Sequence, residues 1–177
     1  MTSSIAGVAS RLGFVLLAAA MLLVGAPTGP AHADCIQTGS VVDCAGPSPG
    51  GFNAGAQDNL TVNVQPGANV GTGLVLNNNN VTSNLGTIAV GSSALGIAAG
   101  LNNSITSSGI ITGGTGSTGI SVNSGAVVTN IGNLTVGDTG TGIALTGTGS
   151  VLNTGSIGGR SAPASPAPAA CGWSGKG

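Results

Sequence analysis

The residues that could perform acid–base or nucleophilic chemistry are few and scattered. The one histidine is His32, the one lysine is Lys176, and the acidic residues are Asp34, Asp43, Asp58 and Asp138. Glycoside hydrolysis needs two carboxyl groups that face each other within about 5–9.5 Å, and these acids share no spacing that would place them so. Serines are plentiful, but no imidazole follows residue 33 to activate one. We therefore predict that the chain is not an enzyme.

Ligands for metals and cofactors are equally scarce. Cys35, Cys44 and Cys171 are the 3 cysteines of the chain, and two neighbouring cysteines without a histidine cannot complete a zinc site. The stretch Gly113–Ile120 approaches a calcium-binding nonapeptide, but Thr118 stands where the ligand aspartate is needed. No glycine-rich stretch continues into Gly-Lys-Ser/Thr, which a phosphate-binding loop requires. We predict no metal and no cofactor.

The composition excludes further partners and limits the fold. Only 4% of the residues are charged, Lys and Arg total 3, and the formal net charge is −1. Because no basic patch is available to neutralise phosphates, we expect no binding to nucleic acid or to an anionic membrane surface. Hydrophobic residues make up 41% of the chain but aromatic residues only 2%. A thin core of aliphatic side chains, as in a stacked solenoid, fits this composition.

The N-terminus has the three parts of a cleaved export signal, predicted to comprise residues 1–33. A short segment ending at Arg11 precedes the apolar run Leu12–Val24, and an Ala-His-Ala cleavage motif follows directly before Asp34. A membrane anchor is the first alternative, but spanning a bilayer takes about 20 apolar residues. A lipoprotein signal is the second, but it needs a small residue before Cys35. We predict export to the periplasm, the cell surface or the medium.

Export places the cysteines in an oxidising compartment, where they can pair. Cys35 and Cys44 bracket a hairpin-like segment with Gly39 at its turn. We predict a disulfide between them that clamps the start of the mature chain, with two free thiols as the alternative. Cys171 is left unpaired in this prediction.

Glycine recurs through the middle of the chain with a constant 23-residue period. One series is Gly73, Gly96, Gly119 and Gly142, and a second is Gly86, Gly109, Gly132 and Gly155. Three apolar columns keep the same step: Leu74, Ile97, Ile120 and Ile143; Leu76, Ala99, Val122 and Leu145; and Ile88, Ile111, Leu134 and Ile157. A polar column of Asn84, Ser107, Asn130 and Asn153 precedes the second glycine series. A period shared by independent columns indicates a repeat architecture.

Each repeat divides into three short strands. In the unit Gly119–Gly142 these are residues 120–122, 127–129 and 134–136, which alternate between apolar and polar side chains. Asn and Gly residues fall between the strands, and both tolerate the left-handed conformations that sharp bends require. The pattern predicts an all-β fold, a parallel β-helix (β-solenoid) with 23-residue coils stacked at about 4.8 Å. Ile97, Ile120 and Ile143 should stack in its interior, and the Asn column should form hydrogen-bonded ladders.

We expect three parts in the mature chain. Residues 34–70 form a Cys-clamped segment with an irregular first coil, and residues 71–159 form four 23-residue repeats. Residues 160–177 form a Pro/Ala/Ser-rich tail, because the corner glycine of the earlier coils is replaced by Arg160 and the β alternation stops there. We expect this tail to result from a shifted reading frame or a gene break, with a genuine Pro-rich linker as the alternative.

Three features together resemble the N-terminal part of a bacterial autotransporter passenger. They are the signal ending in Ala-His-Ala, the pair Cys35 and Cys44 just after it, and coils of the form Gly-Ile-x-Val…Val-Thr-Asn-x-Gly-x-Leu-x-Val, best seen at 119–136. The resemblance covers roughly residues 1 to 159.

The resemblance implies a surface protein with an adhesive or structural role, whose ligand would be a host molecule or another surface. It also implies an outer-membrane translocator barrel, and no alternating strands of such a barrel follow Ile157 in this sequence. One alternative is a stand-alone secreted solenoid, either an ice-binding or a matrix protein. Ice binding would favour a regular threonine array, and the column of Thr72, Thr118 and Thr141 is interrupted by Leu95. The other alternative is a polysaccharide-active β-helix enzyme.

Overall fold

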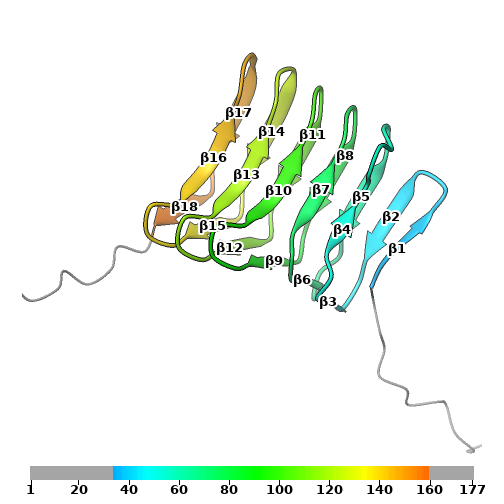
Figure 1. Cartoon of the computed structure of the whole chain (residues 1–177), viewed down its shortest axis with the longest axis horizontal. Helices are drawn as coiled ribbons and strands as arrows, with labels where there is room; N and C mark the ends of the chain where they lie inside the picture. The colour runs from blue at the N-terminus through cyan, green and yellow to red at the C-terminus, as the bar shows by residue number, and fades with distance from the viewer. Residues whose placement is uncertain (1–33, 160–177) are drawn as a thin grey trace, which may run out of the picture. The chain divides into compact units, whose positions relative to one another are not determined.

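A computed structural model describes residues 34–159, which form a β-solenoid of eighteen strands without a helix (Figure 1). The predicted signal peptide, the predicted tail and Cys171 lie outside the described residues. None of the described residues belongs to a helix with the length and hydropathy of a membrane span. The predicted all-β parallel fold is therefore confirmed.

The strands form three sheets, here called the first, second and third sheet. The first contains, in spatial order, β1 (Cys35–Thr38), β2 (Val41–Cys44), β5 (Thr61–Val64), β8 (Val81–Asn84), β11 (Ser104–Ser107), β14 (Ala126–Asn130) and β17 (Gly149–Asn153). The second contains β3 (Pro47–Ser48), β6 (Asn69–Val70), β9 (Thr87–Val90), β12 (Ile110–Gly113), β15 (Asn133–Val136) and β18 (Ser156–Gly159). The third contains β4 (Phe52–Asn53), β7 (Leu74–Leu76), β10 (Leu95–Ala99), β13 (Thr118–Val122) and β16 (Thr141–Leu145).

Successive strands of the chain take turns among the three sheets, so that three strands make one coil. Coils 1 to 5 are β2–β4, β5–β7, β8–β10, β11–β13 and β14–β16, and β17 and β18 begin a sixth. Every pairing between coils is parallel, whereas β1 pairs with β2 in antiparallel orientation. In Figure 1 the coils follow one another from blue to orange, so each sheet runs along the stack.

Paired positions in successive coils are 23 residues apart in most of the stack, but fewer residues separate them at its start. Ser104 pairs with Val127, and Ile97 pairs with Ile120, each one full 23-residue period further along the chain. In the first sheet Val41 pairs with Thr61, a 20-residue step, and the next step to Val81 has the same length. The strands within residues 34–70 thus belong to the same sheets as the glycine-marked repeats, but their coils contain fewer residues.

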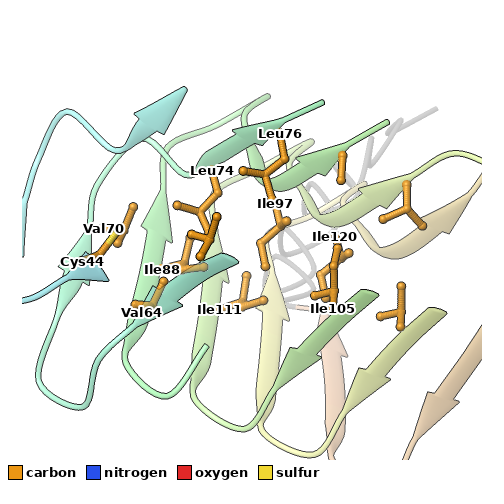
Figure 2. Close-up of a cluster of buried hydrophobic side chains, with 14 of the residues drawn as sticks. Cys44, Val64, Val70, Leu74, Leu76, Ile88, Ile97, Ile105, Ile111 and Ile120 are labelled. Carbon is orange, nitrogen blue, oxygen red and sulfur yellow. The ribbon is translucent and has the colours of Figure 1, made fainter. Parts of the chain in front are cut away.

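The core is a narrow column of aliphatic side chains from all three sheets. Figure 2 shows Ile97 and Ile120 from successive coils beside Ile88, Ile105 and Ile111. Each of these five side chains is at most 1% exposed. No single coil could bury such a face by itself, so stacking creates the core.

The predicted interior column is confirmed for its middle members and modified at its end. Ile97 and Ile120 are fully buried, but Ile143 is only partly buried and packs against the edge of the core. Ile143 lies on β16, which ends the third sheet among the described strands. A side chain that points inward there has a neighbouring coil on one side only.

The two glycine series are required by close packing between coils. Among the eight glycines only Gly73 has a positive φ, of +82°. A Cβ atom at Gly109 would overlap the carbonyl oxygen of Gly86, and one at Gly132 would overlap that of Gly109. The expectation that corner glycines supply left-handed backbone holds for Gly125, at φ +79°, but is wrong for Gly132. At these positions the neighbouring coil occupies the space that a side chain would need.

Candidate functional surfaces

The polar column that precedes the second glycine series joins coils through side-chain hydrogen bonds, and it is buried except at Asn153, which is exposed. Asn84 Nδ2 donates to Ser107 Oγ at 3.1 Å, and Asn130 Nδ2 donates to Asn153 Oδ1 at 2.7 Å. Asn84, Ser107 and Asn130 are fully buried. The predicted ladder is confirmed for these two pairs, and it is interrupted between Ser107 and Asn130. Asn130 Oδ1 has no hydrogen-bond partner among the described residues.

A second buried ladder, which the 23-residue columns did not reveal, lies at the corner before the first sheet. The Leu60 N–H donates to Asn80 Oδ1 at 2.8 Å, and the Asn80 N–H donates to Asn103 Oδ1 at 2.9 Å. Asn103 Nδ2 in turn donates to the Asn77 carbonyl at 2.9 Å. Asn80 and Asn103 are each 1% exposed, so these amides satisfy the backbone where the chain turns.

Left-handed residues stack at the same corner. Asn59, Asn79, Asn102 and Gly125 occupy equivalent places in successive coils with φ between 55° and 79°. The Asn79 N–H donates to the Leu101 carbonyl at 2.9 Å, and the Asn102 N–H donates to the Ser124 carbonyl at 3.0 Å. The run Asn77–Asn80 was the sequence signal for this corner, since Asn is the non-glycine residue that best tolerates the left-handed region.

Asn130→Ala should destabilise the fold by about 0.5–1.5 kcal/mol, because it removes the hydrogen bond from Asn130 Nδ2 to Asn153 Oδ1, and the exposed Asn153 can bond to water instead. Thermal denaturation followed by circular dichroism measures the loss. Asn123→Ala is the matched control, since Asn123 is exposed at the preceding corner of the same coil. Equal melting temperatures for the two variants would show that the ladder contributes nothing to stability.

Three of the four carboxylates accept structural hydrogen bonds, and the fourth, that of Asp138, lies several coils away from them. Asp43 Oδ1 accepts from Asn63 Nδ2 at 2.9 Å, and Asp34 Oδ1 accepts from Ser48 Oγ at 2.9 Å. Asp58 Oδ1 accepts from the backbone N–H at residue 78, at 2.8 Å. Asp138 follows β15 in coil 5, three or more coils from the other acids. Three coils correspond to about 14 Å at about 4.8 Å per coil, which is beyond the separation of paired catalytic carboxylates.

The hairpin β1–β2 lies at the N-terminal edge of the first sheet, whereas the other two sheets end there at β3 and β4. Cys35 and Cys44 are directly opposite each other in the antiparallel pair, and their sulfur atoms are bonded at 2.02 Å. Cys44 is fully buried in the core. The Cys35 N–H donates to Ser48 Oγ at 2.9 Å, and Gly39 has a φ of +61° at the hairpin turn. Strand β1 is therefore attached to coil 1 by backbone pairing, a hydrogen bond and a covalent bond.

We predict that unreduced peptides of the exported protein contain a Cys35–Cys44 linkage and that Cys171 is unlinked. Mass spectrometry of a digest made without reductant decides this. Closing a loop with a sequence separation of 9 residues stabilises the fold by about 2–3 kcal/mol in the chain-entropy account, so reduction should lower the melting temperature. A peptide that joins Cys171 to either partner would contradict the prediction.

The outward side of the first sheet, which has seven strands, is a regular surface. Its two outward columns are Val41, Thr61, Val81, Ser104, Val127 and Ser150, and Asp43, Asn63, Ser83, Thr106, Thr129 and Leu152. Val81 is 53% exposed and Val127 is 50% exposed. This surface, here called the first-sheet face, offers small hydroxyl and amide groups between branched aliphatic side chains.

The threonine column on the third sheet lies where its spacing in the sequence predicts. Leu95 pairs with Thr118, and Thr118 pairs with Thr141, on the outward side of the sheet. Leu95 is 43% exposed, so it interrupts the column as an apolar side chain that faces solvent.

Residues 34–159 contain no group of three or more His, Cys, Asp or Glu side chains that could hold a metal ion. No family model, curated protein or solved structure matches the chain.

Proposed function

We propose that this chain is a non-enzymatic structural module that is exported and displayed at the cell surface, as a passenger segment of an autotransporter with an adhesive or structural role. The observation that supports this most is the uninterrupted stack of coils, in which the interior asparagines bond one coil to the next. Polar residues that complete the scaffold in this way are not available to a substrate. The fold is a rod-like support for whatever its outer faces bind.

The first-sheet face is the surface that we propose for adhesion. Asp43 is the one charged residue in its two columns, so recognition there would use hydrogen bonds and apolar contact. Residues 34–159 contain neither Lys nor Arg, which disfavours nucleic acid and anionic lipid as the ligand. A neutral surface of a host or of a neighbouring cell fits this chemistry best.

The alternatives have weaker support. A polysaccharide-active enzyme needs paired carboxylates, and Asp138 is separated from the other acids by at least three coils. An ice-binding or matrix solenoid favours a regular threonine array, and Leu95 breaks the array on the third sheet. We therefore rank the surface passenger first.

The test is display of the chain on a Gram-negative host, fused in frame to an autotransporter barrel. We expect a mature N-terminus at Asp34, accessibility to external protease, and binding of the cells to a panel of abiotic and host-matrix surfaces above that of cells with the barrel alone. Val81→Lys together with Val127→Lys should reduce this binding without unfolding the stack, because both side chains face solvent. The matched control is Val75→Lys, on the outward side of the third sheet.

An unprocessed chain retained in the cytoplasm would contradict export. Binding no greater than that of the barrel alone would contradict the adhesive role. Turnover of polygalacturonate by the mature protein, lost in Asp138→Asn, would support the enzyme instead.

A further inference from the structure

The strand β1 buries little side-chain surface against the rest of the described residues. Ile36 is 61% exposed, and Thr38 at the end of the strand is exposed as well. Cys35 is partly buried and packs against the core, and its sulfur is bonded to that of Cys44, which is 0% exposed. The Cys35–Cys44 bond is therefore what ties the side chains of β1 to the interior.

The neighbouring strand β2 is anchored in the stack independently of β1. It pairs in parallel with β5, and its Val42 is 0% exposed in the core. Backbone hydrogen bonds continue this pairing at both ends of β2. The Thr61 N–H donates to the Ser40 carbonyl at 2.8 Å, and the Gln65 N–H donates to the Cys44 carbonyl at 2.9 Å. We therefore expect β2 to stay in the stack when β1 leaves it.

The hydroxyl of Ser48 contacts the disulfide as well as the backbone of β1. The Cys35 N–H donates to Ser48 Oγ at 2.9 Å, and Ser48 is 0% exposed. Ser48 Oγ lies 2.9 Å from Asp34 Oδ1 and 3.3 Å from Cys35 Sγ. Because a hydroxyl has one proton, it can donate to only one of these two acceptors at a time. The carboxylate is the stronger acceptor while Cys35 is in the disulfide, and a Cys35 thiolate would compete for the same proton.

We propose that the Cys35–Cys44 bond is a redox-controlled latch, which a dithiol reductant opens so that β1 leaves β2 while the coils stay stacked. Without the bond, β1 is a short strand that pairs on one side only among the described strands. The conformational entropy of its residues opposes that pairing, and so little side-chain burial does not offset it. Release uncovers the Cys44 thiol and the backbone groups of β2 that face β1. An edge strand uncovered in this way can pair with another extended segment.

The dithiol balances the exchange. A thiolate of the reductant attacks the sulfur of Cys35, which is the more accessible of the two, and Cys44 leaves as a thiolate that takes up a proton. The second thiol of the reductant then attacks the mixed disulfide and forms the reductant's own disulfide. Cys35 leaves as a thiolate, to which Ser48 Oγ is placed to donate. Two electrons and two protons thus pass from the dithiol to the two cysteines, and reoxidation closes the latch.

Hydrogen exchange and iodoacetamide labelling of the exported protein, with and without dithiothreitol, test the latch. We expect reduction to abolish protection of the β1 amides and to expose Cys44 to rapid labelling, while the Thr61 and Gln65 amides stay protected by their bonds to β2. Cys35→Ser should behave in this way without reductant, and dithiothreitol should change it no further. Ile36→Ser is the matched control on the same strand, since it keeps the bond and should keep β1 protected until reductant is added.

Each other result overturns the proposal. Protected β1 amides in the reduced protein, or a Cys44 thiol that resists iodoacetamide there, would mean that β1 stays in place without the bond. Loss of protection also at Ser104 and Val127, whose amides donate to the preceding coil, would mean that the bond holds the whole stack. A bond that dithiothreitol leaves intact in the folded protein would contradict attack at Cys35. The latch does not rest on export or adhesion, which are tested by display.

Discussion

Ile120→Asp should unfold the mature protein under conditions in which the unsubstituted protein is folded. Ile120 is fully buried and lies in register between Ile97 on β10 and Ile143 on β16. Replacing it removes buried aliphatic contacts worth about 2–5 kcal/mol. It also buries a carboxylate with no cation in reach, because residues 34–159 contain neither Lys nor Arg. The sum approaches the whole stability of a typical domain, about 5–15 kcal/mol.

Circular dichroism across a thermal ramp measures this loss, and Ser121→Asp is the matched control. Ser121 is the next residue of the same strand but points outward, so its carboxylate stays hydrated. A surface substitution of this kind should change the stability by less than about 0.5 kcal/mol. If Ile120→Asp melts at the same temperature as Ser121→Asp, our assignment of the inward and outward sides is wrong.

Gly132→Ala should cost about 3 kcal/mol or more, because the neighbouring coil leaves no room for even one methyl group. The new Cβ would overlap the carbonyl oxygen of Gly109 and lie 2.7 Å from the carbonyl carbon of Ser108. These are backbone atoms of the neighbouring coil, so no side chain can move aside and the two coils must separate at this corner. Insertion of a methyl group into packed structure costs about 1–3 kcal/mol even where side chains can adjust.

Gly91→Ala provides the control for this effect. Gly91 precedes the bend that contains Ser93, and a Cβ atom added to it would meet nothing within 4 Å. The φ of Gly91 is not positive, so alanine can adopt the same backbone conformation. Alanine there should be neutral or stabilise the fold by about 0.4–1 kcal/mol, since it restricts the unfolded chain. Equal denaturation midpoints for Gly132→Ala and Gly91→Ala would contradict the close approach of the coils at the second glycine series.

The sequence was sufficient to predict the coil period, the parallel stack and the interior position of Ile97 and Ile120. These follow from one physical requirement, which is that equivalent inward positions of stacked coils share one core. The first two coils were harder to predict because the first sheet advances there by a 20-residue step. A column such as Val42, Val62 and Thr82 does not keep the 23-residue period that marks the later repeats.

Two features of the corners could not be derived from periodicity alone. A regular spacing of glycine is explained either by a need for left-handed backbone or by a lack of room for a side chain. At Gly132 only the position of the next coil shows that the second explanation applies. The second ladder, at Asn80 and Asn103, was hidden because its column continues as Ala126 on one side and Leu60 on the other. Leucine, asparagine and alanine therefore share one buried column, and only the asparagines form the ladder.

The periodic pattern of the sequence predicts the fold but does not predict which ligand the outer faces bind. Stacking restricts the inward side chains, whereas the outward column Leu95, Thr118 and Thr141 changes from apolar to polar without loss of pairing. Fold periodicity therefore places these residues on a surface but does not specify what that surface binds.

The stacking of coils in 23-residue register is tested most directly by a nuclear Overhauser spectrum of the isotope-labelled mature protein. We expect cross-strand backbone contacts from Ala98 to Ser121 and from Ser121 to Ala144, and methyl contacts from Ile97 to Ile120. Such contacts join equivalent residues of successive repeats and arise only where parallel strands lie side by side. A spectrum whose long-range contacts instead join neighbouring strands of one coil as antiparallel hairpins would contradict the β-solenoid.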